Sequence, residues 1–283
     1  MDRRQYRRAG GTVVAVGLVV CVGTCATGCG SGAAAEDARG AADPVIALHR
    51  AADMLRDAGS SKAGTSMEMA TGGTRVTIRG KGVYDYRRQL GRLTVVLPQD
   101  PAGTTEHRPI TELLAPGALF MKNRGAGVPA DKWVRIETAT LSDGNLVTGG
   151  ATDPYAAAEL LRGTRTASYV GRTEVAGTEV LHYRGTADLA AAAEEASAGN
   201  RAALQAAAKG FATADVPFDA YLDDQGRIRK LCQRFSFVNG QRQATVDVAS
   251  TTLLYDFGAP VDVRLPRSND IYAGRIAENQ PEN

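Results

Sequence analysis

Residues 76–86, VTIRGKGVYDY, decide the fold, because apolar and polar side chains alternate along them. Val76, Ile78, Tyr84 and Tyr86 share one parity. The other parity is mainly polar and holds Thr77, Arg79, Lys81 and Asp85. Successive side chains of a β-strand point to opposite faces, so this alternation predicts a strand with one buried and one solvated face. Such strands are typical of an antiparallel sheet that packs on a core with one face only.

The alternation continues on both sides of this stretch. Met67 and Met69 alternate with polar neighbours upstream, and Gly72-Gly73 predicts a hairpin turn between the two strands. The methionine pair fits ordinary strand packing better than a soft wall for a ligand. Further strands are expected at 93–97, 119–122, 133–136, 167–175, 180–185, 218–222, 227–237 and 244–255, with an edge strand at 261–265.

Two helices are expected to begin in the same way, with an Asp cap before a Pro at the first helical position. These starts are Asp43-Pro44 and Asp153-Pro154. Apolar residues at helical spacing carry the first helix over 44–58, and the second is short, over 156–161. An alanine-rich stretch predicts a helix or a broken helical hairpin over 189–198 and 201–208.

Together these elements predict an α+β domain over residues 43–271. Its fold would be a curved antiparallel β half-barrel with helices covering the concave face. A sheet of roughly eight or more strands with one apolar face must curl around its cover, and incomplete filling would leave an apolar cavity. Residues 29–42 are rich in Gly and Ala and predict a flexible tether, and 272–283 predict a polar tail.

The first 28 residues have the pattern of a bacterial lipoprotein signal peptide. A basic head precedes an uncharged apolar stretch that ends at Ala26-Thr27-Gly28-Cys29. We expect cleavage before Cys29, lipid attachment at Cys29, and a position on the extracytoplasmic face of the cell membrane. The alternative is an uncleaved span, since roughly 20 apolar residues cross a bilayer. The Arg3-Arg4 pair leaves Sec and twin-arginine export both open.

The net charge and the cysteine content of the mature chain limit the functions and the cross-links that it can have. The net charge of +2 includes four arginines and one aspartate in the first 28 residues, so the mature side chains sum to −1. A near-neutral domain offers no electrostatic basis for nucleic-acid binding. Besides Cys29, the mature chain keeps only Cys232, which cannot form an internal disulfide and is expected to be a small buried apolar residue.

The sequence contains no recognisable catalytic motif. It lacks a G-x-S-x-G nucleophile motif, an H-E-x-x-H pair and a glycine-rich phosphate loop. His49, His107 and His182 have no metal-binding spacing. Asp223-Asp224 with Gly226 matches a calcium loop only in part and fits a hairpin turn. We therefore expect no enzyme activity, no cofactor and no metal site.

The order of several short segments indicates a known family. After Cys29 these segments are Asp43-Pro44, 119–122, 132–134, Asp153-Pro154, 175–178, 182–183, 221–223 and 226–227. In this order they resemble the LppX/LprG-like lipoproteins of actinobacteria, which are similar in fold to the periplasmic lipoprotein carrier LolA. The resemblance implies binding of acylated lipids or glycolipids in a half-barrel cavity and help in moving them across the envelope. It carries over one site residue, Cys29.

Two functions follow from this pattern. The first is a lipid-anchored protein that binds or carries an acylated lipid, with Val95, Met121, Val134 and Ile136 as expected cavity-lining residues. Burial of each CH2 group is worth about 0.8 kcal/mol, so apolar area alone can hold an acyl chain. The alternative is an envelope sensor or interaction protein with the same fold, a membrane-protein partner and no transported ligand. A connected apolar pocket favours the first, and a filled core with an exposed apolar patch favours the second.

Overall fold

Eleven strands and four α-helices form the part of the chain that the computed structural model describes, residues 43–71, 74–98, 108–125, 127–239 and 244–274. The strands are β1 (Ser60–Thr71), β2 (Thr74–Asp85), β3 (Leu90–Val96), β4 (Ile110–Ala115), β5 (Ala118–Lys122), β6 (Val134–Glu137), β7 (Thr164–Val175), β8 (Thr178–Asp188), β9 (Asp215–Leu222), β10 (Ile228–Asn239) and β11 (Ala244–Tyr255). The helices are α2 (Pro44–Ala58), α3 (Pro154–Leu160), α4 (Leu189–Glu195) and α5 (Ala198–Gly210), with short 3-10 helices η1 (Thr138–Thr140), η2 (Leu161–Gly163) and η3 (Ser268–Asp270).

The predicted signal peptide over 1–28, Cys29 and the rest of the tether lie outside the described residues, as does 275–283 of the predicted tail. Within the described ranges, no helix is both long and apolar enough to cross a membrane.

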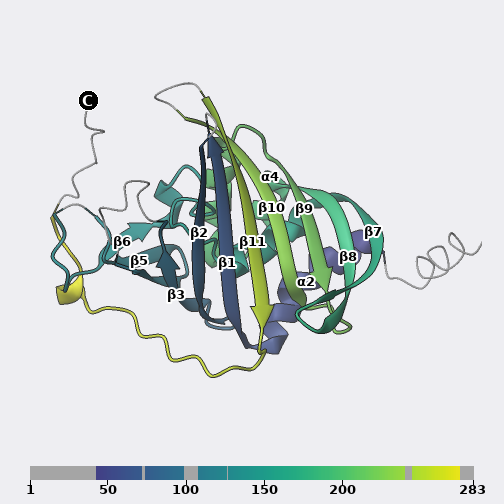
Figure 1. Cartoon of the computed structure of the whole chain (residues 1–283), viewed down its shortest axis with the longest axis horizontal. Helices are drawn as coiled ribbons and strands as arrows, with labels where there is room; N and C mark the ends of the chain where they lie inside the picture. Colours follow the sequence, from purple (N-terminus) through teal and green to yellow (C-terminus); the bar gives the residue numbers. More distant parts are fainter. Residues whose placement is uncertain (1–42, 72–73, 99–107, 126, 240–243, 275–283) are drawn as a thin grey trace, which may run out of the picture.

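The strands follow one another in the order β6-β5-β4-β3-β2-β1-β11-β10-β9-β8-β7, and neighbouring strands are antiparallel. The chain enters the sheet at its centre with β1, runs outward to β6, crosses to β7 at the opposite edge, and returns to β11 beside β1 (Figure 1). Because β6 and β7 are the two edges of the order, the curved sheet stays open. The predicted α+β half-barrel is confirmed.

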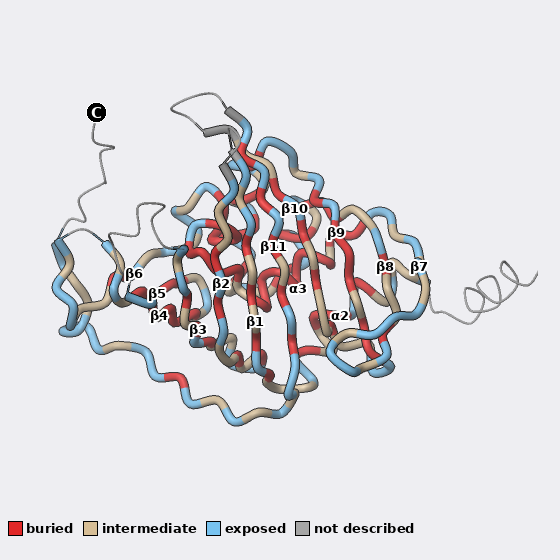
Figure 2. The backbone as a smooth tube through the Cα atoms, in the orientation of Figure 1, coloured by how far each residue is buried: buried red, intermediate tan, exposed pale blue. Residues whose placement is uncertain are grey.

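Along most strands, alternate residues form an inner face that is buried and an outer face that is largely exposed (Figure 2). On β2, Ile78 and Tyr84 are buried on the inner face, whereas Arg79 and Lys81 are exposed on the outer face. Inner-face side chains and the helices form one apolar cluster that extends over most of the sheet. The period-two pattern of 76–86 therefore predicted the correct face for each of these residues.

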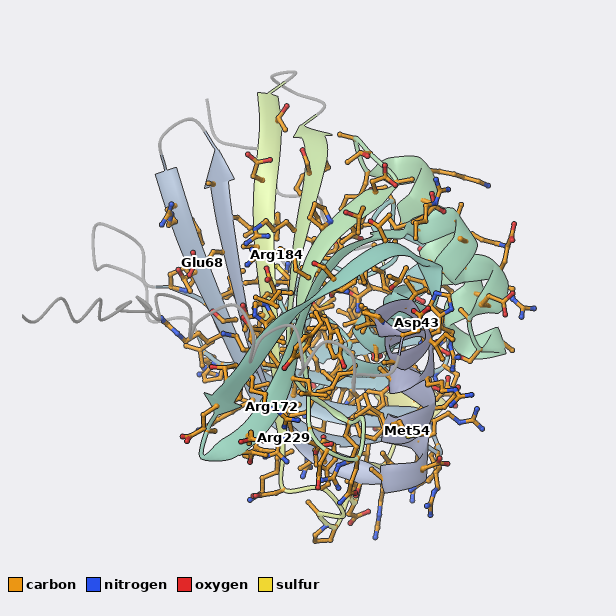
Figure 3. The ribbon with its side chains drawn as sticks, turned by 90° about the vertical axis from the view of Figure 1, so that its right-hand side faces the viewer. Asp43, Met54, Glu68, Arg172, Arg184 and Arg229 are labelled. Carbon is orange, nitrogen blue, oxygen red and sulfur yellow. The ribbon has the colours of Figure 1, made fainter. Side chains whose placement is uncertain are left out.

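Helix α2 has the bounds that the sequence predicts. Asp43 Oδ1 accepts a 2.8 Å hydrogen bond from the backbone N–H of Val45, and the helix ends at Gly59, whose φ of 82° favours glycine. Figure 3 shows the sheet and the helices as two layers, with Glu68 on the sheet side and Met54 on α2. The buried side chains of α2 are Leu48, Ala51, Ala52 and Leu55.

The alanine-rich stretch forms two helices, α4 and α5, but the break lies at Ala196-Ser197 and not at 199–200. Glu159 on α3 decides this position. Its carboxylate accepts hydrogen bonds from the backbone N–H and hydroxyl of Ser197, both at 2.9 Å, and from Nδ2 of Asn200 at 2.8 Å. These bonds satisfy donors at the start of α5, so Gly199 lies inside that helix.

Three further expectations differ from the structure. Strand β4 is missed, because Leu113 and Leu114 place apolar side chains on both of its faces. The edge strand at 261–265 is wrong: this segment forms no strand, and Val263, which is 3% exposed, packs in a small cluster with Leu113 of β4 and with Ala118 and Phe120 of β5 on the outer face. Its alternation reflects one-sided packing on the sheet. Cys232 is half-buried and pairs with an outer-facing residue of β11, so it is not a core residue.

Candidate ligand-binding faces

The four residues predicted to line a cavity lie on the inner face, at one end of the sheet. Val95 is on β3, Met121 on β5, and Val134 and Ile136 on β6, where Met121 and Val134 are register partners. Val95 has no exposed surface, Met121 is 4% exposed and Val134 is 3% exposed. Ile136 packs partly buried against the same cluster. All four are therefore core residues in this structure, and their contact with a ligand stays a prediction.

A stretch of the chain itself occupies the inner face beside these residues. We call residues 141–153 the inner loop; it is the first half of the crossing from β6 to β7. Leu146 and Ala151 have no exposed surface. A methyl group placed on Gly150 would lie 3.4 Å from Ile78 Cγ2 and 3.5 Å from Val95 Cγ1. The inner loop thus packs directly on β2 and β3, in the space that a ligand of the inner face would need.

The middle of the inner loop is held mainly by hydrogen bonds within itself. The carboxylate of Asp143 accepts hydrogen bonds from the backbone N–H groups of Asn145 (3.1 Å), Val147 (2.8 Å) and Thr148 (2.5 Å). Asn145 Oδ1 accepts another from the N–H of Gly149 at 3.1 Å. These backbone donors would stay satisfied if the loop moved away from the sheet as a unit.

The C-terminal end of the inner loop is tied to the sheet. The hydroxyls of Thr152 and of Ser250 on β11 lie 2.7 Å apart. The hydroxyl of Tyr84 on β2 donates a 3.3 Å hydrogen bond to Asp153, the cap of α3. Burial raises the pKa of Asp153 to about 6, against the lowering effect of its hydrogen bonds.

Glu112 is a buried acid on the inner face that the sequence did not reveal. It lies on β4 opposite Met121, has no exposed surface, and neither of its carboxyl oxygens has a hydrogen-bond partner among the described residues. A methyl group on Gly149 would lie 3.3 and 3.5 Å from those oxygens. Burial raises the pKa of Glu112 to about 8, and the positive charge of Arg124 lowers it only in part. At neutral pH the side chain is therefore mainly a neutral acid that can donate a hydrogen bond.

A small hollow lies beside the inner loop, where the loop meets the end of α5 and β10. Its volume is about 110 Å³, and its lining includes Val147, Phe211 and Phe237. The ring of Phe211 stacks on that of Phe235, with centroids 5.1 Å apart. This aromatic seam is one place where the inner layer already has free space.

The outer face carries two larger hollows. The first, about 860 Å³, crosses β3, β2, β1 and β11; we call it the outer groove. Its floor includes Gly64 and Ser66, and its walls include Arg79, Val96 and Leu253. The second hollow, about 680 Å³, lies further along β1 and β11 and reaches β9. Both are formed by outer-facing side chains, on the face where the sequence predicted only solvated residues.

Two of the three histidines lie within the described residues, His49 on α2 and His182 on β8. His49 Nε2 lies 3.0 Å from the carbonyl oxygen of Thr164, and His182 Nε2 lies 2.7 Å from Oδ1 of Asp219. His107 lies outside the described residues. In the part of the chain that the structure describes, no group of three or more His, Cys, Asp or Glu side chains is placed to hold a metal ion.

Comparison with known proteins finds similar solved structures but no matching family model. No family model and no curated protein matches the sequence. Among solved structures, the lipoprotein LppX of Mycobacterium tuberculosis is similar over 78% of this chain and 98% of its own, with 11% identity and a TM-score of 0.44. LprF of Mycobacterium bovis is similar over 79% and 96%, with 13% identity and a TM-score of 0.40. The LolA superfamily protein NE2245 of Nitrosomonas europaea is similar over 76% and 95%, with 9% identity and a TM-score of 0.34.

These proteins are of the kinds that the predicted resemblance names. At such identities and TM-scores the likeness says nothing about ligand or mechanism, so what the protein does has to be argued from its own residues.

Proposed function

We propose that this chain is a cell-envelope lipoprotein that binds the acyl chains of a lipid or glycolipid on the inner face of its half-barrel. One observation supports it above the others: the inner face is a continuous apolar surface, and its cover consists of separate pieces rather than a second sheet. The inner loop is one of these pieces, and the hydrogen bonds of Asp143 and Asn145 hold its middle to itself rather than to the sheet.

The apolar burial that is lost when the inner loop leaves the inner face is regained when acyl chains take its place. The loop covers Val95 and Ile78 with its own backbone and with Leu146 and Ala151. An acyl chain would bury the same apolar surface, at about 0.8 kcal/mol per CH2 group. Because the hydrogen bonds of Asp143 and Asn145 lie within the loop, they need not break when it moves. The aromatic seam at Phe211 is where a chain would first enter.

Glu112 gives this apolar face one polar contact. As a neutral acid without a partner, it can donate a hydrogen bond to an ester or hydroxyl oxygen of the bound lipid. Lipid binding would thus satisfy a group that the ligand-free structure leaves unsatisfied. In this proposal Cys29 carries the membrane anchor on the extracytoplasmic side, no catalytic step takes place, and Val95, Met121, Val134 and Ile136 contact the acyl chains.

A reversible disulfide between the inner loop and the sheet tests the proposal. The hydroxyls of Thr152 and Ser250 are 2.7 Å apart, so the double variant Thr152→Cys/Ser250→Cys places two thiols within disulfide reach. Full-length protein would be extracted from its producing cells in a nonionic detergent, and co-purified lipid would be counted by native mass spectrometry. We expect bound lipid in the wild type and in the reduced variant, and loss of most of it from protein oxidised before exposure to lipid.

The reduced form and the single variant Ser250→Cys are the matched controls. Equal lipid content in the oxidised and reduced double variants would contradict displacement of the inner loop. Lipid-free wild type that is fully folded would contradict lipid binding altogether.

That last outcome would favour the alternative, an envelope sensor or protein-interaction lipoprotein with the same fold. A specific observation supports this second candidate: the inner face is filled by the protein itself, while Val96 and Leu253 on the outer face are 50% and 39% exposed. An apolar outer surface of this kind is typical of a binding face.

A further inference from the structure

The outer groove is built from two rows of side chains that cross four strands. One row runs through Thr251, Ser66, Arg79 and Val96, and the other through Leu253, Gly64, Lys81 and Thr94. At the centre of the rows stand Ser66 and Gly64, the smallest side chains. A Cβ atom added to Gly64 would meet nothing within 4 Å. The groove is therefore an open trough over β1, and no described segment fills it.

The charges that line the groove have one sign. Arg79 and Lys81 are exposed and form no ion pair among the described residues, and the lining contains no carboxylate. The second hollow on the same face differs, since Glu68, Asp215 and Asp247 balance its two arginines. Unpaired cations in a recessed site attract an anion more strongly than cations on a flat surface do.

The remaining wall of the groove is apolar. Val96 is 50% exposed and Leu253 is 39% exposed, and Leu97 and Pro98 continue the wall beyond β3. Large apolar side chains are left in water here although the inner face buries residues of the same types. Covering them with an alkyl chain would gain about 0.8 kcal/mol for each CH2 group buried.

We propose that the outer groove is a second binding site, for a single anionic amphiphile with a carboxylate or phosphate head group. The head group binds between Arg79 and Lys81, and its chain lies along Val96 and Leu253. The hydroxyls of Ser66 and Thr94 are placed to donate hydrogen bonds to the head group. A bilayer surface is a poor fit, because a flat surface reaches only the rim of a trough of about 860 Å³. This site does not depend on the inner-face site.

Photo-crosslinking in native membranes tests this site on the full-length chain. The probe is palmitic acid with a diazirine in its chain, and its methyl ester is the neutral counterpart. After irradiation, labelled residues are mapped by tandem mass spectrometry. We expect the acid to label Val96 and Leu253 rather than their buried neighbours Val95 and Leu254, and the ester to label Val96 and Leu253 much less.

Two variants with matched controls sharpen the result. Gly64→Trp fills the trough without a clash and should abolish this labelling, whereas Ala249→Trp, which fills the second hollow on the same face, should leave it unchanged. The double variant Arg79→Ala/Lys81→Ala should lower labelling by the acid about two- to thirtyfold, since two exposed charge contacts together are worth about 0.4 to 2 kcal/mol. Arg92→Ala removes an exposed cation of β3 that does not line the groove and should have no effect.

Equal labelling by the acid and the ester would overturn the anionic selectivity. Labelling of Val96 and Leu253 that survives Gly64→Trp, or label found only on inner-face residues such as Val95 and Met121, would overturn the site itself. Label confined to the inner face would at the same time support the proposed function, so the two proposals fail separately.

Discussion

Along β3, Val95 has no exposed surface while its neighbour Val96 is 50% exposed, although the two residues are identical and adjacent. The difference comes from what crosses each face of the sheet. Strands β6 and β7 lie at opposite edges, so the connection between them has to pass over one face, and it carries the inner loop and α3 across the inner one. Of the segments that the structure describes, only the one after β11 crosses the outer face, where it covers β4 and β5. Burial of an apolar residue here depends on chain path as much as on residue type.

The largest expected effect comes from placing the same charge on the two neighbouring valines. Val95→Asp puts a carboxylate into the inner cluster without a partner, and we expect it to lower the free energy of unfolding by more than about 4 kcal/mol or to prevent folding. Val96→Asp should change it by less than about 0.5 kcal/mol. Urea unfolding followed by the fluorescence of Trp133 measures both. Similar losses in the two variants would show that the faces are not distinct at β3.

The effect of pH on the free energy of unfolding tests whether Glu112 is buried without a partner on the inner face. Its pKa is about 8 in the folded protein and near its ordinary value of 4.5 when unfolded, so the folded state holds the proton more tightly. The free energy of unfolding should therefore fall as pH rises from about 4.5 to 8. Glu112→Gln removes this loss and should be more stable than wild type at pH 8 by on the order of 4 kcal/mol, with little difference at pH 4.

A pH range and a control variant separate the titration of Glu112 from that of other carboxyl groups. The pKa of Asp153 is raised to about 6, so its titration changes the free energy of unfolding mainly below pH 6. The pKa of Glu112 is about 8, so the change in this free energy between about pH 6 and 8 comes mainly from Glu112. Glu174→Gln, an exposed residue of β7, is the matched control and should leave the pH profile unchanged. A wild-type profile that is flat between pH 6 and 8 would mean that Glu112 has a partner in solution.

The smallest effect is expected where the outer face is covered. Val263→Ala removes part of a side chain that is 3% exposed against β4 and β5, and we expect a loss of about 1 kcal/mol. Hydrogen exchange should report faster exchange at the backbone N–H of Tyr272, which donates a 2.8 Å bond to Trp133. Leu265→Ala, at a residue that is 42% exposed, should change neither reading. Equal losses of the free energy of unfolding in Val263→Ala and Leu265→Ala would mean that the segment after β11 is held on β4 and β5 along its length, and not by Val263 in particular.

The sequence correctly predicted the elements whose structure is set by residues close to them in the chain. Helix α2 has its predicted bounds because Asp43 and Gly59 lie next to the residues they cap. Strand β2 was recognised because only one of its faces packs on other parts of the chain. Strand β4 was missed for the opposite reason: Leu113 meets the distant Val263 on the outer face, so no alternation remains in its sequence. The break between α4 and α5 is set by Glu159, which no pattern within 189–208 contains.

The sequence by itself determined the period of the strands that pack on one face only, the Asp caps of α2 and α3, the inner-face position of Val95, Met121, Val134 and Ile136, and a resemblance to half-barrel lipoproteins. These follow from side-chain alternation and from capping, which act between near neighbours. Only the tertiary structure decided that the inner loop fills the inner face, that Glu112 is buried without a partner, and that Gly64 opens a groove between Leu253 and Val96. Each of these depends on segments far apart in the chain meeting across the sheet, and the pairing of β1 with β11 brings them there.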